Sequence, residues 1–510
     1  MIDLFGGLSP TTTDPSADVR LLDTTLRDGE QAPGVALSPE EKATIASDLD
    51  ATGVSVIEAG SACTGEGERA AIRRVTERDL DATVTSFCRG VRSDVDHALD
   101  CDVDGVHLVV PASDRHIEGK VGTDREGVID TTVDLVEHAT DHDLWVEVIG
   151  EDGSRSDLDF LETLMGAAVE AGADRTCFAD TVGHAGPERV AEGVARLAEH
   201  GPVSVHTHDD LGLALTNALA GIGAGADLVH STVNGIGERA GNVALEEVAI
   251  ALEHVYGLET VRLERLYPLA ELVADATGVP LPPNKAVVGE NAFTHESGIH
   301  TDGTLKDDSM YEPYPPETVG RERRLVLGKH AGHAGVQAAL AEHDVEVEEA
   351  DLDTIVERVK DLGERDKRVT DADLLTIAED VSGRERDRRV ELRDLTAVSG
   401  SDTPTASVRL SVDDEERVAS GVGDGPVDAA LNAVREALDD AVFRLDSYHV
   451  DAVTGGTDAM VTVEVGLSRG DRSVTVAASD ADITRASVEA MVDGLDRLLP
   501  AEGATVSLDD

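Results

Sequence analysis

Short apolar runs rich in β-branched residues recur through the first half of the chain, each followed by a stretch with the apolar spacing of an amphipathic helix. Helix start signals such as Ser38-Pro39-Glu40-Glu41 and Gly186-Pro187-Glu188 stand between the runs. Eight strand–helix repeats predict a (β/α)₈ barrel over residues 19–278, and a doubly wound open sheet is the alternative. The predicted strands are residues 19–22, 54–58, 83–87, 105–110, 144–149, 175–178, 203–206 and 228–233.

The pattern changes twice beyond the barrel. Residues 279–394 are expected to form linker subdomains, helical from about 336 to 381, with an Arg-rich and Asp-rich linker at 383–394. Residues 395–510 are expected to form an α+β domain with a two-fold repeat, in which strands precede helices that start near Val427 and Ile483. Such a module is more often regulatory or oligomeric than catalytic. Residues 1–18 would be an N-terminal leader.

The composition limits the partners and the compartment. There are 103 acidic and 43 basic residues, a net charge of −60 that is spread over the whole chain, so nucleic acid and anionic membranes are excluded as partners. The N-terminus lacks a secretion signal, and no apolar run approaches the length of a membrane span. Four cysteines, at 63, 88, 101 and 177, show no close pairing motif. A cytoplasmic protein is expected.

Candidate metal ligands follow three of the predicted strands. Asp28 comes after the first strand, His206 and His208 alternate around Thr207 at the end of the seventh, and Asn242 lies in a Gly-rich loop after the eighth. In a closed barrel these side chains would meet at one mouth, which favours the barrel over the open sheet. Imidazole, carboxylate and amide ligands suit Mn²⁺, Mg²⁺, Zn²⁺ or Co²⁺. The simpler interpretation of the histidine pair is hydrogen bonding in the barrel mouth.

Other polar residues stand near the strand ends. Arg27 precedes the candidate metal carboxylate and could hold a substrate carboxylate or an alkoxide, or could form a salt bridge to Glu58 or Glu147. Ile149 alternates with Glu147 on one face of its strand, so it could size a pocket that Glu151 borders. The loop at 235–242 lacks the Lys-Ser/Thr ending of a nucleotide-phosphate loop.

These motifs together resemble the acyl-CoA-dependent 2-oxoacid synthases, namely 2-isopropylmalate, (R)-citramalate and homocitrate synthases. The resemblance covers nearly the whole chain apart from the first eighteen or so residues and the linker. The segments that carry it are residues 26–31, 206–212, 234–242, 282–285, 291–300, 425–430 and 455–459.

The resemblance implies a metal-dependent acyltransferase that uses acetyl-CoA in a Claisen-type condensation. Asp28, His206, His208 and Asn242 would bind the metal, and Arg27, Glu151 and Thr181 would hold the 2-oxoacid. His295 and Tyr311 match residues that reach into the barrel of the neighbouring subunit, which implies a homodimer, and His295 with Glu238 would relay the proton. The C-terminal domain resembles the family's allosteric domain, so a branched-chain amino acid is the expected effector.

The 2-oxoacid depends on the pocket wall, where one or two methylenes are worth only about 1 to 3 kcal/mol. Ile149 is bulky and favours pyruvate, whereas His107 on the fourth strand leaves room for a larger substrate. Residues 58–69 resemble archaeal citramalate synthases, so the expected product is (R)-citramalate, for isoleucine synthesis. The alternatives are 2-isopropylmalate synthesis from 2-oxoisovalerate, for leucine, and, less favoured, homocitrate synthesis, a lyase of the same barrel type, or a non-catalytic amino-acid sensor.

The dispersed acidity predicts adaptation to high salt. Charge screening acts over about 3 Å at 1 M salt and about 10 Å at 0.1 M, so self-repulsion among 60 excess negative charges grows as salt is removed. The thermal unfolding midpoint is expected to fall when KCl is lowered over that range. A midpoint that stays constant or rises in a calorimetric salt series would contradict the salt adaptation.

Overall fold

The computed structural model describes residues 19–365, 369–382, 388–400, 403–413, 415–438, 443–452, 461–470 and 472–499. The chain divides into two compact units, which are described separately below. The first comprises Met1–Phe293 with Tyr314–Arg323, and the second comprises Thr294–Pro313 with Arg324–Asp510. The expected leader at 1–18 and the motif at 455–459 lie outside the described residues.

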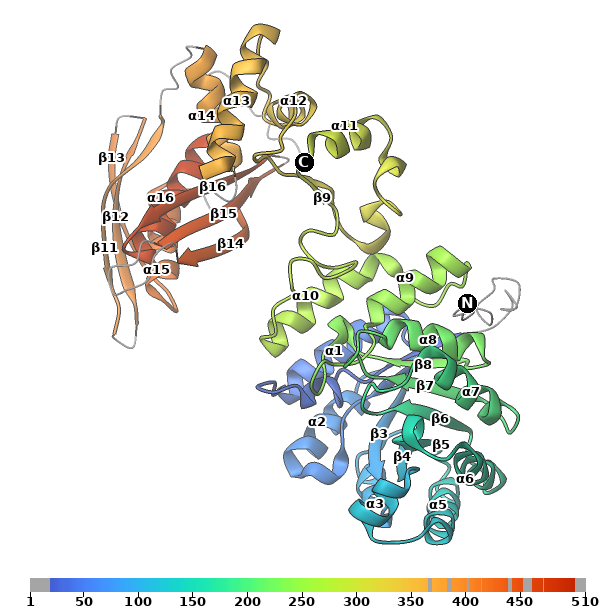
Figure 1. Cartoon of the computed structure of the whole chain (residues 1–510). Coiled ribbons are helices and arrows are strands. Elements are labelled where there is room, and N and C mark those ends of the chain that lie inside the picture. Colours follow the sequence, from blue (N-terminus) through green and yellow to red (C-terminus); the bar gives the residue numbers. More distant parts are fainter. Residues whose placement is uncertain are drawn as a thin grey trace. The chain divides into compact units, whose positions relative to one another are not determined.

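Eight parallel strands of the first unit close into a barrel in chain order, which confirms the (β/α)₈ prediction and rules out the open sheet (Figure 1). Closure is set by the pairing of the first strand with the eighth, where Leu22 stands opposite His230. The strands are β1 Arg20–Asp23, β2 Val56–Glu58, β3 Thr83–Arg89, β4 Gly105–Pro111, β5 Trp145–Glu151, β6 Arg175–Asp180, β7 Val203–Thr207 and β8 Leu228–Ser231.

Helices surround this barrel and bury the outward faces of its strands. The start signals act as expected: Ser38 forms a capping box with Glu41 at the first helix, and Pro187 occupies the first turn of α7. The helices are α1 Pro39–Thr52, α2 Glu66–Thr76, α3 Arg92–Leu99, α4 Asp114–His116, α5 Arg125–Thr140, α6 Leu158–Glu170, α7 Pro187–Ala198, α8 Ala214–Gly223, α9 Leu245–Tyr256 and α10 Leu266–Thr277.

The barrel floor is an apolar plug. Leu22, Val56 and Leu228 form a cluster of their own, against which Trp145 packs. Gly105 makes room for the indole, because a β-carbon there would lie 2.6 Å from the Trp145 carbonyl oxygen and 3.0 Å from its ring. Solvent is therefore excluded from the end of the barrel opposite the strands' carboxyl ends.

A charged layer lies above this floor. Its members face inward from five strands and are almost completely buried: Glu58, His107, Glu147, Ser204 and His230. They pair with one another only in part. His107 Nδ1 lies 2.7 Å from Glu58, His230 Nε2 lies 2.9 Å from Glu147, and Glu147 accepts a hydrogen bond from the Ser204 hydroxyl, whereas His107 Nε2 and His230 Nδ1 have no hydrogen-bond partner among the described residues. A third inward layer, at the carboxyl ends of the strands, carries the candidate site.

In its described residues, the second unit contains four linker helices and two similar α+β modules (Figure 1). In each module three antiparallel strands precede a helix, which confirms the expected two-fold repeat. The first strand begins at Val390, so the expected boundary at 395 falls inside a strand. The elements are β9 Thr294–His295, α11 Gly298–Lys306, β10 Arg324–Leu325, α12 His333–Glu342, α13 Glu349–Arg365, α14 Asp371–Ser382, β11 Val390–Val398, β12 Thr405–Val412, β13 Glu415–Val422, α15 Pro426–Ala437, β14 Arg444–Ala452, β15 Val461–Arg469, β16 Arg472–Asp480 and α16 Ile483–Leu498.

The membrane-span and cysteine expectations can be compared with the structure. No helix within the described ranges is both long and apolar enough to cross a membrane. The four cysteines all lie in the described part of the chain and are free thiols there.

A fully buried lysine ties the loop after β1 to the surrounding helices. Lys42 on α1 has no exposed surface, and its ammonium group lies 2.9 Å from the Leu26 carbonyl oxygen, 2.7 Å from Glu30 and 2.8 Å from Glu68. Glu68 also accepts a hydrogen bond from the Ser61 amide. One cation thus joins the loop that carries Arg27 and Asp28 to two helices and the β2–α2 connection.

Replacing Lys42 with Met is expected to lower the free energy of unfolding by about 3 kcal/mol, because two inward-turned carboxylates and a carbonyl group lose their partner. Urea unfolding in constant high salt measures this change. Arg74→Met on α2 is the control, since Arg74 forms ion pairs on the exposed surface and its loss should change stability little. Equal effects of the two substitutions would contradict the anchoring role of Lys42.

Candidate active site

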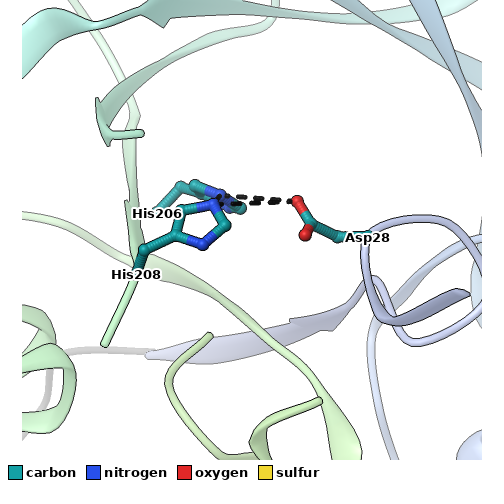
Figure 2. Close-up of side chains that lie close together, drawn as sticks. All are labelled: Asp28, His206 and His208. Atoms are coloured by element: carbon teal, nitrogen blue, oxygen red, sulfur yellow. Dashed lines mark hydrogen bonds and ion pairs between the residues drawn. The ribbon is translucent and has the colours of Figure 1, made fainter. Parts of the chain in front are cut away.

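Three of the four candidate metal ligands meet at the mouth of the barrel. The β1 strand runs into a tight turn in which the Asp28 amide donates to the Thr24 carbonyl, and this turns the Asp28 side chain toward β7. His206 lies on β7 and His208 just beyond it, so both imidazoles face the same side. Figure 2 shows both rings directed at the Asp28 carboxylate. All three side chains are buried, and their ligand atoms lie within 4.8 Å of one another.

The distances leave room for one ion between these groups. His206 Nε2 and His208 Nε2 are 3.2 Å apart and lie 3.7 Å and 3.9 Å from Asp28 Oδ2. The other ring nitrogen of His208, Nδ1, lies 3.2 Å from the Gly241 carbonyl oxygen. A hydrogen bond from Nδ1 to that oxygen leaves the Nε2 lone pair facing the carboxylate, as a metal-binding histidine requires.

Asn242 completes the set from the loop after β8. Its Nδ2 donates to Asp28 Oδ1 at 3.0 Å and to the Ile236 carbonyl oxygen, while its Oδ1 is buried without a hydrogen-bond partner among the described residues. A buried amide oxygen without a partner, on a side chain that contacts the Asp28 carboxylate, is a group that could bind a cation. The residues present therefore fit a divalent cation.

The protonation states also suit metal binding. Burial lowers the pKa of His206 well below 6.5, with the neighbouring His208 adding to the effect, and burial likewise lowers the pKa of His208. Burial alone would raise the pKa of Asp28, but Arg27 and the two imidazoles outweigh it, so that pKa is lowered. Neutral imidazoles and an ionised carboxylate are the forms that bind a cation.

Arg27 is held in place by two carboxylates. Its Nε donates to Glu58 Oε2 at 2.6 Å and its Nη1 to Asp28 Oδ2 at 2.7 Å, and the guanidinium carbon lies 4.8 Å from the centre of the Phe87 ring. The salt bridge to Glu58 that the sequence offered as an alternative is therefore formed. It anchors Arg27 beside the candidate metal position instead of removing it from the site.

A second cluster of possible ligands lies one layer deeper but is a poorer metal site. Glu147, Cys177 and His230 also bring ligand atoms within 4.8 Å of one another. However, Glu147 already pairs with His230, and burial together with the charge of Glu147 raises the pKa of the Cys177 thiol well above its usual value. A protonated thiol is a weak ligand. His107 belongs to this deeper layer, where it is fully buried against Glu58.

An apolar wall from β4, β5 and β6 adjoins the candidate metal ligands, since Ala179 on β6 is the register partner of His206 on β7. Ile149 on β5 packs with Cys177 and Ala179 of β6, and Val109 of β4 lies against them. These residues are separate from the large core under the helices, which places them inside the barrel. Sequence analysis identified Ile149 alone; the same alternation applied to the two neighbouring strands would have found the other three.

The other candidate substrate-binding and catalytic residues at the mouth differ in their protein partners. Glu151 at the end of β5 pairs with Lys120 at 2.6 Å and with His116 at 3.2 Å. The Thr181 hydroxyl accepts a hydrogen bond from the Asp152 amide. Glu238 is more than half exposed and lies 3.4 Å from the Arg239 guanidinium.

His295 and Tyr311 belong to the second unit. His295 Nε2 lies 3.1 Å from Glu312 Oε1, a buried carboxylate that sequence analysis did not single out. The Tyr311 ring is 42% exposed and lies 4.3 Å from the His300 ring. An imidazole held by a buried carboxylate can exchange protons, and the catalytic role of His295 stays a prediction.

Comparison with known proteins identifies the family. Three family models match successive parts of the chain: HMGL-like over residues 18–273, homocitrate synthase post-HMGL domain-like over 287–367, and LeuA allosteric (dimerisation) domain over 368–499. The (R)-citramalate synthase CimA of Methanocaldococcus jannaschii is 47% identical over 488 residues, which cover 94% of this chain and 99% of that protein. A Methanothermobacter thermautotrophicus protein named "Putative (R)-citramalate synthase CimA" is 54% identical over 488 residues, 95% of this chain and 98% of that protein.

The chain belongs to the (R)-citramalate synthase family. It is therefore an enzyme of the HMGL-like acyltransferase class. Among solved structures, a hydroxymethylglutaryl-CoA lyase from Pseudomonas aeruginosa aligns with 52% of this chain and 95% of its own, at 22% identity and a TM-score of 0.48.

An unusual carboxyl group supports the β1 loop of this synthase-family barrel. Asp23 is fully buried and accepts hydrogen bonds from the Thr25 amide at 2.8 Å and the Thr25 hydroxyl at 3.0 Å. Burial raises its pKa to about 7, with Glu246 adding to the rise, although the Thr25 hydrogen bonds oppose it. Asp23 is therefore protonated in the folded protein under mildly acidic conditions.

This shift predicts a pH dependence. Between the unfolded pKa of 3.8 and the folded pKa of about 7, the folded state holds a proton that the unfolded state has lost, so stability falls as pH rises through this window. Relative to Asp23→Asn, the wild type should lose about 1.4 kcal/mol of unfolding free energy per pH unit there, and the difference should level off above pH 7. Urea unfolding from pH 4.5 to 8 in constant salt measures both proteins. Parallel curves would show that Asp23 titrates normally.

Proposed function

We propose that this enzyme condenses acetyl-CoA with pyruvate to give (R)-citramalate and CoA. The proposal rests on the barrel mouth, which has one polar side and one apolar side. Asp28, the two histidines and Arg27 offer a polar side for the ketone and carboxylate of a 2-oxoacid, whereas the wall around Ile149 offers an apolar side for a small alkyl group. Pyruvate has this pairing of a carboxylate and ketone with a single methyl group.

The polar side would hold a divalent cation between Asp28, His206, His208 and Asn242 Oδ1. When bound, such a cation polarises the ketone oxygen and stabilises the negative charge that develops on it. Arg27 can donate to the substrate from its free guanidinium edge, because Glu58 and Asp28 hold the other positions. Thr181 and Glu151, at the ends of neighbouring strands, are the further candidates for holding the oxoacid.

Bond formation requires a base for the acetyl methyl group. His295, held by Glu312, is our candidate for the group that accepts this proton, with Glu238 and Tyr311 as assisting residues. The resulting carbanion attacks C2 of pyruvate, and the ketone oxygen gains a proton to become the hydroxyl of citramalyl-CoA. Water then cleaves the thioester, which releases citramalate and the free thiol of CoA.

The apolar wall argues against the two larger substrates. The isopropyl group of 2-oxoisovalerate would need the space that the Ile149 side chain fills. The second carboxylate of 2-oxoglutarate, the homocitrate synthase substrate, would face Val109, Ile149, Cys177 and Ala179, which provide no cation. A non-catalytic sensor is disfavoured because the complete ligand set and Arg27 are retained.

The C-terminal modules bear on the assembly state and regulation of the enzyme. The match to a LeuA allosteric (dimerisation) domain supports a homodimer and feedback control by a branched-chain amino acid. A dimer would also allow residues of the linker, including His295 and Tyr311, to serve the barrel of the partner subunit.

The direct test is release of the CoA thiol in high salt with Mn²⁺ and acetyl-CoA. The wild type should prefer pyruvate to 2-oxoisovalerate in kcat/KM by about 10-fold to 200-fold, and a chelator should abolish release with both. Ile149→Ala should shift the ratio toward 2-oxoisovalerate by about 10-fold or more, because it opens the wall.

Val148→Ala is the matched control. Val148 is equally buried on the same strand but faces the helices, so its truncation should lower stability and leave the substrate ratio unchanged. A wild type that prefers 2-oxoisovalerate would make the protein a 2-isopropylmalate synthase instead.

A further inference from the structure

One arginine connects three loops of the barrel mouth. Arg239 lies in the loop after β8, and its Nε and Nη2 donate to the two oxygens of Asp210 at 2.9 and 3.0 Å. Nη2 also donates to the Thr181 carbonyl oxygen at 3.0 Å. Thr181 follows β6 and Asp210 follows β7, so a single guanidinium joins the loops after the sixth, seventh and eighth strands.

Each of these loops carries a residue of the candidate site. Asp210 stands two residues after His208, Arg239 stands three residues before Asn242, and Thr181 is itself a candidate for the oxoacid. The backbone reinforces the connection, because the Asp209 amide donates to the Gly241 carbonyl oxygen and His208 pairs with Asn242 in an isolated bridge.

The backbone of Arg239 is unusual for a residue with a side chain. Its φ is +55°, in the left-handed region that favours glycine. The loop is tightly folded around Asn242: a β-carbon on Gly237 would lie 2.4 Å from Asn242 Nδ2, and Gly241 has a φ of +87°. The Asp210 contact is equally close, since a β-carbon on Gly183 would lie 2.7 Å from its carboxylate. These close contacts restrict the conformation of the loop after β8 while the Arg239 side chain keeps its hydrogen bonds.

We propose that Arg239 is a positioning residue that fixes Asn242 and Thr181 relative to Asp28 before metal and oxoacid bind. The inference rests on the proposed metal-dependent function. The competing explanation is an ordinary surface ion pair, because Arg239 is 40% exposed and Asp210 24% exposed. Such a pair would add little to stability and nothing to metal affinity. The hydrogen bond to the Thr181 carbonyl oxygen and the tight packing of the Arg239 loop around Asn242 distinguish the two explanations.

The test is the Mn²⁺ dissociation constant of the resting full-length protein, measured by electron paramagnetic resonance without substrates. Arg239→Ala should weaken Mn²⁺ binding by about 10-fold or more, as the loss of groups that orient metal ligands does, and Arg239→Lys should recover part of the loss. Arg196→Ala is the control, because Arg196 forms comparable ion pairs on α7 away from the mouth. Thermal unfolding of all variants separates lost positioning from lost folding.

Mn²⁺ affinity of Arg239→Ala within two-fold of wild type would overturn the positioning role. Loss of affinity that only matches a fall in unfolding midpoint, in both the Ala and the Lys variant, would overturn it as well. Neither result would bear on the choice of pyruvate as substrate. Conversely, a wild type that binds Mn²⁺ tightly, loses it on Arg239→Ala and fails to turn over pyruvate would refute the proposed reaction and leave the positioning role supported.

Discussion

The buried carboxylate of Asp28 is the group on which the site depends. It lies between the Arg27 guanidinium at 2.7 Å and two neutral imidazoles, and all of these ligand side chains are buried. An isolated carboxylate would not stay ionised there, so Arg27 must be present, and Arg27 in turn needs Glu58 as its second partner. The charges of the mouth are therefore interdependent. A divalent cation would add the positive charge that the carboxylates and the amide oxygen of Asn242 still lack.

The layered interior explains how one barrel can combine this polar site with selectivity for a small alkyl group. The apolar floor closes one end, the charged layer above it binds Arg27 through Glu58, and the top layer is divided between candidate metal ligands at the ends of β1, β7 and β8 and an apolar wall on β4, β5 and β6. The two halves come from different strands and meet where Ala179 on β6 pairs with His206 on β7, so Val109 and Ile149 can change without direct contact with the candidate ligands. Under the proposed function, substrate preference and chemistry would thus be set by separate residues.

Much of this arrangement follows from the sequence, and the missing parts have physical reasons. Apolar runs and helix caps predict the barrel, and the rule that strand ends meet at one mouth brings Asp28, His206 and His208 together. The rest of the apolar wall depends on the register of neighbouring strands, and the buried Lys42 depends on partners 12 and 26 positions away, neither of which a local pattern reveals. The start of the strand at Val390 does not follow from the sequence because the segment before it is rich in Arg and Asp and much of the strand is exposed.

The proposed reaction requires His206, His208 and Asp28 to hold one cation. Electron–nuclear double resonance of Mn²⁺ bound to protein labelled with ¹⁵N-histidine tests this ligand set. We expect couplings to two histidine nitrogens in the wild type and to one after His208→Ala. A wild-type spectrum without ¹⁵N coupling, or one that His208→Ala leaves unchanged, would contradict it.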